Sequence, residues 1–254
     1  MKITKTDRNN DNTPILSNRE IDEFAHEVLK DYKPSLLREP GAIDYENFLE
    51  SYLGAKIIFR DLYNENPEKL MYARTIFTDR LVKVFNREKN CISNIPVRGN
   101  TVILDNYVIE SGREKLAKFT GLHEAGHLLI HYGVYSVFKA GQICCRRENI
   151  EGYGKPIETP EQWIEHQANY FAAAVAMPNA TFNPLVGNFL RENGLWKTII
   201  LGVDDDLDLL AKDLLPEYIA EIYDVSKQTA FIKLKSNGFI STKSGMNLKD
   251  VIYS

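Results

Sequence analysis

Two histidines with a glutamate between them give this chain its clearest chemical signal. The segment HEAGH places His123 and His127 four residues apart, so both imidazoles project from one face of an α-helix and can bind one ion. Two neutral imidazoles leave most of the positive charge on a zinc ion, which lowers the pKa of a water molecule to about 7. The spacing therefore predicts two Zn²⁺ ligands, with Glu124 as the general base that takes a proton from that water.

A catalytic zinc site also needs a third protein ligand and one open position. We expect Glu165 to be this ligand, because it shares a helix face with Ala168 and Ala172, and small residues let helices approach closely. The neighbouring His166 is the alternative, since it would bind instead if the helix turned by about 100°. His131 lies about 12 Å beyond His123 along a helix axis, so we expect it behind the ligands or in the core.

Capping boxes predict the helices that carry these residues. Each box is a serine or threonine followed three residues later by Glu or Gln, and the predicted helices run from Ser17 to Tyr32, Ser111 to Tyr132 and Thr159 to Pro178. Between the first two, short β-branched or aromatic runs at 56–59, 72–77, 81–85 and 101–104 predict strands. The fold class is therefore α+β, with a small and mostly antiparallel sheet.

The two halves of the site together resemble a known family. HEAGHLLIH (123–131) followed by EHQANYFAAAVAMP (165–178) is similar to the ImmA/IrrE family of zinc metallopeptidases, and the likeness covers roughly residues 17–195. It implies a zincin-like domain with ligands His123, His127 and Glu165 and with Glu124 as catalytic base. Asn169 stands where related helices often place an acid that orients a ligand histidine. An amide can still accept that hydrogen bond, but it adds no charge.

The 32 residues between Tyr132 and Glu165 depart from the minimal family pattern. We expect this insertion to form a lid or a partner-binding loop. Cys144 and Cys145 within it could be soft metal ligands, but we expect inert or redox-exposed loop thiols, because neighbouring side chains point apart and no C-x-x-C pair exists. Three tyrosines are candidates to stabilise an oxyanion, and the sequence does not rank them: Tyr132, Tyr135 and Tyr153.

Three segments are expected along the chain: a disordered tail over 1–16, the peptidase domain over 17–203, and a helical module over 204–254. The last segment resembles a helix-turn-helix, but it holds six lysines against nine acidic residues. DNA-binding modules are normally basic. DNA binding is therefore unlikely on charge grounds, although Lys227, Lys233 and Lys235 leave a weak nucleic-acid face open.

The composition favours a cytoplasmic protein that binds another protein. The net charge of −4 disfavours nucleic acid and anionic lipid, and no apolar stretch approaches the length of a membrane span. The resemblance implies an endopeptidase that cleaves a helix-turn-helix transcriptional repressor and so releases mobile-element or stress-response genes. The alternative is a regulatory binding protein with a structural or vestigial metal site, which acts through protein or DNA contact.

Overall fold

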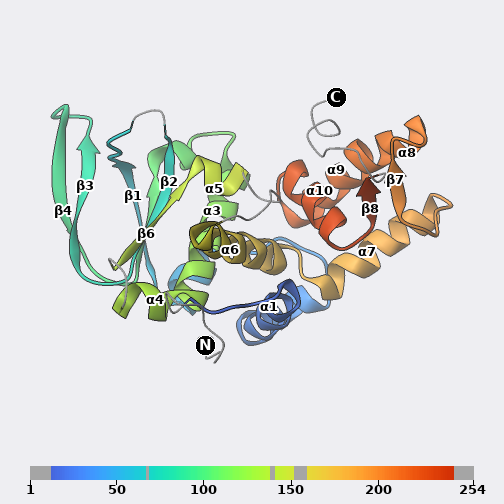
Figure 1. Ribbon diagram of the computed structural model, residues 1–254, viewed down its shortest axis with the longest axis horizontal. Coiled ribbons are helices and arrows are strands. Elements are labelled where there is room, and N and C mark those ends of the chain that lie inside the picture. Colours follow the sequence, from blue (N-terminus) through green and yellow to red (C-terminus); the bar gives the residue numbers. More distant parts are fainter. Residues whose placement is uncertain (1–12, 67–68, 138–140, 152–158, 243–254) are drawn as a thin grey trace. The chain divides into compact units, whose positions relative to one another are not determined.

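The computed structural model describes residues 13–66, 69–137, 141–151 and 159–242. They divide into two compact units, one drawn from Met1–Tyr32 and Ile43–Val175 and the other from Lys33–Ala42 and Ala176–Ser254. This division differs from the expected boundary after residue 203. The reason is that residues 199–201 form a strand that pairs with the strand at 240–242, which ties the segment before 203 to the end of the chain (Figure 1).

The first unit contains a six-stranded sheet in the order β4-β3-β1-β5-β2-β6. Its strands are β1 (Lys56–Leu62), β2 (Met71–Ile76), β3 (Arg80–Asn86), β4 (Cys91–Val97), β5 (Thr101–Asp105) and β6 (Gln142–Arg146). Only β1 and β5 pair in parallel, with Ile58 opposite Ile103, and the other paired strands are antiparallel. The expected α+β class with a mostly antiparallel sheet is confirmed, as are the four predicted strand positions.

β6 corrects the expectation for the insertion between the two halves of the site. Residues 142–146 form an edge strand rather than part of a loop, because Ile143 and Cys145 alternate inward along a segment that pairs with β2. Tyr153 and the rest of 152–158 lie outside the described residues. The insertion therefore contributes to the sheet beside the site.

Helices and helical turns complete the first unit. They are α1 (Asn18–Tyr32), α2 (Tyr45–Asn47), η2 (Phe48–Tyr52), η3 (Asn106–Ile109), α3 (Glu114–Ile130), α4 (Tyr132–Val137), α5 (Arg147–Glu151) and α6 (Pro160–Ala176). α3 packs on β2 and β5, and every residue from Ala117 to Ile130 is buried. A helix buried on all sides has little amphipathic pattern, so its position depends on packing rather than on a polar face.

Two of the three predicted capping boxes are present. Ser17 and Glu20 cap α1 reciprocally, and Thr159 and Gln162 do the same before α6. The third prediction is wrong, because α3 begins after Arg113 without a side-chain cap, and Glu114 instead accepts from the backbone N–H of Gly112 at 3.0 Å.

The N-terminal segment also departs from expectation. Thr13, Pro14 and Leu16 are buried, so at least residues 13–16 are not a disordered tail, whereas 1–12 lie outside the described residues. The apolar side chain of Leu16 is buried, which holds this residue in place. The carbonyl of Pro14 accepts a hydrogen bond from Gln167 of α6 at 2.9 Å. The segment is thus attached to the helix that carries Glu165.

The second unit consists of short helices and a two-stranded parallel sheet. Its elements are η1 (Pro34–Leu37), α7 (Asn179–Glu192), β7 (Ile199–Leu201), α8 (Asp205–Leu209), η4 (Leu210–Leu214), α9 (Leu215–Tyr223), α10 (Lys227–Ser236) and β8 (Ile240–Thr242). α9 ends at Asp224 in a left-handed conformation, and the Ser226 side chain caps α10 by accepting from Thr229 N at 3.1 Å. α9 and α10 thus form the predicted helix, turn and helix. Among the described helices, none combines the length and apolar character needed to cross a bilayer.

Candidate metal centre

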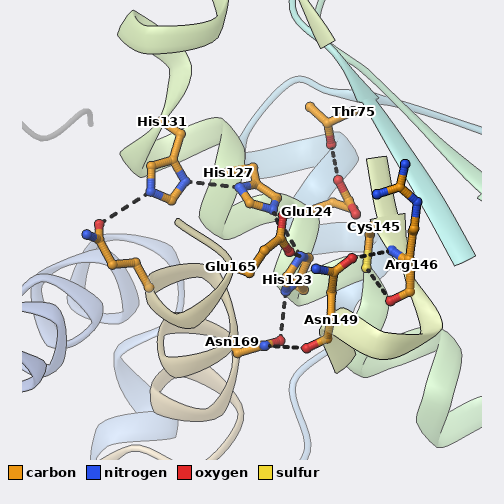
Figure 2. Close-up of polar contacts among 11 residues, drawn as sticks. Thr75, His123, Glu124, His127, His131, Cys145, Arg146, Asn149, Glu165 and Asn169 are labelled. Carbon is orange, nitrogen blue, oxygen red and sulfur yellow. Dashed lines mark hydrogen bonds and ion pairs between the residues drawn. The ribbon is translucent and has the colours of Figure 1, made fainter. Parts of the chain in front are cut away.

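α3 brings the two histidines of HEAGH together inside the first unit. His123 and His127 are both fully buried, and their Nε2 atoms lie 2.9 Å apart. Figure 2 shows the two rings converging from successive turns of the helix. The pair therefore offers two nitrogen atoms to one position, as the four-residue spacing predicts.

α6 supplies the carboxylate that faces this pair. Glu165 Oε2 lies 3.2 Å from Nε2 of His123 and 3.8 Å from Nε2 of His127. The helices can approach this closely because Gly126 has no side chain: a Cβ there would lie 3.1 Å from Cα of Ala168. The small residues at these two positions therefore place the carboxylate against the imidazoles.

Asn169 fixes which nitrogen of His123 carries the proton. The amide of Asn169 donates from Nδ2 to the carbonyl of Asn149 at 2.8 Å, so its Oδ1 is the atom that faces Nδ1 of His123, also at 2.8 Å (Figure 2). An amide oxygen can only accept, so Nδ1 donates and Nε2 of His123 keeps its lone pair toward Glu165.

These donor atoms fit a zinc ion. Glu165 Oε2 is buried and has no hydrogen-bond partner among the described residues, although two imidazole nitrogens lie close to it. A tetrahedral ion about 2.0–2.2 Å from each ligand separates its ligand atoms by about 3.3–3.6 Å. The three separations found here, 2.9, 3.2 and 3.8 Å, are distributed around that range. Two imidazoles and one carboxylate are also a donor set that catalytic zinc uses.

The charges in the cluster favour an ionised Glu165. Burial alone would raise the pKa of this carboxyl group, but its interactions with the facing rings of His123 and His127 outweigh burial and hold the pKa well below its usual range. Burial likewise would lower the pKa of His123, and the facing Glu165 raises it instead. The ionised carboxylate is therefore suited to bind a cation together with the imidazoles.

Glu124 lies next to this cluster, and only one of its two carboxylate oxygens accepts a hydrogen bond from a described residue. The hydroxyl of Thr75 on β2 donates to Oε2 of Glu124 (Figure 2), whereas Oε1 is buried and has no hydrogen-bond partner among the described residues. Burial raises the pKa of Glu124, and the two neighbouring histidines partly oppose this. A carboxylate with a raised pKa and one unpartnered oxygen is suited to take up and return a proton.

The two other histidines considered for the site, His131 and His166, are not brought to the cluster as ligands. His131 lies behind His127, with its Nδ1 3.0 Å from Nδ1 of His127, and burial lowers its pKa well below the usual value. His166 turns away and its Nε2 lies 3.0 Å from Oδ1 of Asn18 on α1. The structure thus orients Glu165, and not its neighbour His166, toward the two imidazoles.

The cysteines and tyrosines differ in how they relate to the site. Cys145 is buried on β6, where its Sγ lies within 4.8 Å of a His123 nitrogen and a Glu124 oxygen, so it is not an exposed loop thiol. Burial and the negative charge of Glu124 raise its pKa well above the usual value, which keeps the thiol protonated. Tyr132 and Tyr135 instead pack against the ring of Phe77.

Sequence reasoning missed Thr75, Asn149 and Gln167. Each acts on a site residue that is distant in sequence, and a lone threonine in a strand or a lone amide in a helix carries no spacing signal. The strand prediction for 72–77 did include Thr75, but only the pairing of β2 with its neighbours and the packing of α3 on it show that this hydroxyl meets Glu124.

Comparison with known proteins adds little to this geometry. No family model matches the chain, and no curated protein does. Among solved structures the chain is similar to a Mycobacterium tuberculosis transcriptional regulator, with a TM-score of 0.41 and 10% sequence identity. The match covers 89% of this chain and 48% of that chain, so this chain spans about half the length of the regulator. Function must therefore be argued from the site itself.

Proposed function

We propose that this chain is a zinc-dependent endopeptidase with a zincin-like fold, of the kind that the ImmA/IrrE resemblance implies. The observation that carries the proposal is the convergence of His123, His127 and Glu165 beside Glu124, whose carboxylate lies within 4.8 Å of a His123 nitrogen. Three ligands and an adjacent carboxylate are the parts that metal-assisted peptide hydrolysis requires.

His123, His127 and Glu165 would hold the ion. Zinc in this position lowers the pKa of a water molecule and polarises a peptide carbonyl group. Glu124 would accept the proton of the water on its Oε1 atom, because Oε2 is already bound by Thr75. Its raised pKa then favours return of the proton to the departing amine.

The proposed substrate is a helix-turn-helix repressor in the cytoplasm, which rests on the family resemblance alone. The lysines of α10 argue against DNA as the target of the second unit. On α10, Lys227 pairs with Asp213, and Lys233 is only 1% exposed, so two of the three lysines that could form a basic face are already engaged or buried. A phosphate backbone needs exposed cations.

One experiment tests the activity directly. The purified chain is mixed with zinc and with candidate helix-turn-helix repressors, starting with any that an adjacent reading frame encodes, and cleavage is followed by gel electrophoresis and mass spectrometry. We expect one or few cuts by the wild type and none by Glu124→Gln, which should still hold zinc by elemental analysis because residue 124 is not a ligand. Continued cleavage by Glu124→Gln would refute its role as base.

The regulatory alternative is tested on the same material. If the wild type binds zinc but leaves the repressor intact, and instead binds duplex DNA with an affinity that falls steeply with salt, the chain acts as a binding protein. We expect negligible DNA binding at physiological salt. A Glu165→Ala protein should lose most of its zinc, and stoichiometric zinc in that variant would remove Glu165 from the proposed ligands.

A further inference from the structure

His127, unlike His123, has no amide against its second ring nitrogen. Its Nδ1 atom faces another imidazole, that of His131, at 3.0 Å. Either ring could donate in such a contact, and the two choices have opposite consequences for His127. If Nδ1 of His127 carries the proton, Nε2 has a lone pair for a metal ion; if Nε2 carries it, the ring cannot bind one.

The far side of His131 decides between these choices. Its Nε2 atom lies 3.3 Å from Oε1 of Gln167, and Gln167 donates from Nε2 to the carbonyl of Pro14 at 2.9 Å. A backbone carbonyl only accepts, so the amide nitrogen of Gln167 must face Pro14 and its oxygen must face His131. Nε2 of His131 therefore donates, its Nδ1 accepts, and Nδ1 of His127 is the donor.

The chain of contacts is closed to water. His127, His131 and Gln167 are all fully buried, and Pro14 is buried as well. Bulk water does not reach these buried groups, so reversing one hydrogen bond would leave two donors or two acceptors face to face, which is costly in the interior. The direction of the whole chain is therefore set at its end, by the Pro14 carbonyl.

We propose that His131 and Gln167 are positioning residues that present the Nε2 lone pair of His127 to the metal ion. This inference rests on the proposed metal site. Gln167 and Asn169 thereby have equivalent tasks on α6: each uses an amide anchored to a backbone carbonyl to fix a ligand histidine, Asn169 directly and Gln167 through His131. The N-terminal segment around Pro14 becomes part of the support of the metal site.

Zinc affinity of four variants tests the proposal, measured by competition with a chromogenic chelator at neutral pH. His131→Leu removes the acceptor, and we expect zinc to bind 10- to 100-fold more weakly. His131→Asn offers its Oδ1 near the position of the lost Nδ1, and it should recover most of the affinity. Gln167→Met frees His131 to reverse and should resemble His131→Leu. His166→Leu, a matched change outside the chain of contacts, should bind zinc like the wild type.

The outcomes separate this proposal from the proposed function. Wild-type affinity in His131→Leu, or an equal loss in His131→Leu and His131→Asn, would overturn the positioning role while the metal site stands. A wild type that binds no zinc would overturn both. Thermal unfolding of each variant with chelator present shows whether a loss of affinity reflects a loss of fold.

A second measurement needs no variant. NMR of the metal-free wild type with ¹⁵N-labelled histidine distinguishes Nδ1–H from Nε2–H rings. We expect the Nδ1–H form at His127 and the Nε2–H form at His131. The opposite pair of forms would overturn the proposal, whatever the variants show.

Discussion

Gly126 and Ala168 hold the two helices of the candidate metal centre in backbone contact. A Cβ atom on Gly126 would lie 3.1 Å from Cα and 3.2 Å from the carbonyl oxygen of Ala168. Both of these are backbone atoms, which cannot move aside as the end of a side chain can. The distance between α3 and α6, and hence between the imidazoles and Glu165, is therefore set by the absence of a side chain at Gly126.

A larger residue at position 126 should force the helices apart. We expect Gly126→Val to lower the free energy of unfolding by about 2 kcal/mol, as overpacking does, and to weaken zinc binding as well. Urea unfolding with chelator present and zinc competition measure the two effects. Gly187→Ala is the control, because a Cβ there meets nothing within 4 Å, and it should stabilise α7 by about 0.5–1 kcal/mol. Unchanged stability and affinity in Gly126→Val would show that the helix distance is not fixed here.

Asn169 should contribute to zinc affinity through His123. Asn169→Leu removes the acceptor for Nδ1 of His123, so we expect zinc to bind 10- to 100-fold more weakly. Asn169→Asp keeps an acceptor and should bind zinc more tightly than the leucine variant. Chelator competition checks both. The same affinity in the leucine and aspartate variants would mean that orientation of His123 does not depend on this contact.

The pH below which cleavage activity is lost should depend on Thr75. Its hydrogen bond favours the ionised form of Glu124 and so lowers the pKa of that group, against the larger effect of burial that raises it. Thr75→Val removes the hydroxyl without changing shape, so the pKa of Glu124 should rise and activity should be lost at a higher pH than in the wild type. The rate of repressor cleavage against pH measures the shift. Thr120→Val removes a buried hydroxyl of α3 that has no hydrogen-bond partner among the described residues, and it should leave the profile unchanged.

The elements of the site were predictable from the sequence because they depend on local signals. The four-residue spacing in HEAGH holds wherever the helix packs, and the capping box at Thr159 and Gln162 starts α6 by contacts within one turn. The small residues Ala168 and Ala172 on the face of Glu165 predicted close packing of this helix. These local signals show which helix face each residue lies on and where each helix begins. That information is sufficient to orient His123, His127 and Glu165.

The supporting contacts were not predictable because they join residues far apart in sequence. Asn149 lies on a short helix within the insertion that was expected to be a lid or loop, and Pro14 lies in a segment expected to be disordered. A polar composition predicted that tail, but Thr13 and Leu16 are buried, and burial depends on the folding of distant parts of the chain. Local composition does not contain that information.

Two truncations test whether the N-terminal segment supports the metal site. Removing residues 1–12 leaves Thr13–Leu16 in place, whereas removing residues 1–16 also removes the Pro14 carbonyl that orients Gln167. We expect the longer truncation to bind zinc about 10-fold or more weakly than the shorter one, because Gln167 can then turn and His131 loses its fixed direction. It should also unfold more easily, because the buried side chain of Leu16 is lost. Chelator competition and urea unfolding on both truncated proteins measure these differences, and equal zinc affinity in the two would show that the Pro14 carbonyl has no influence on His127.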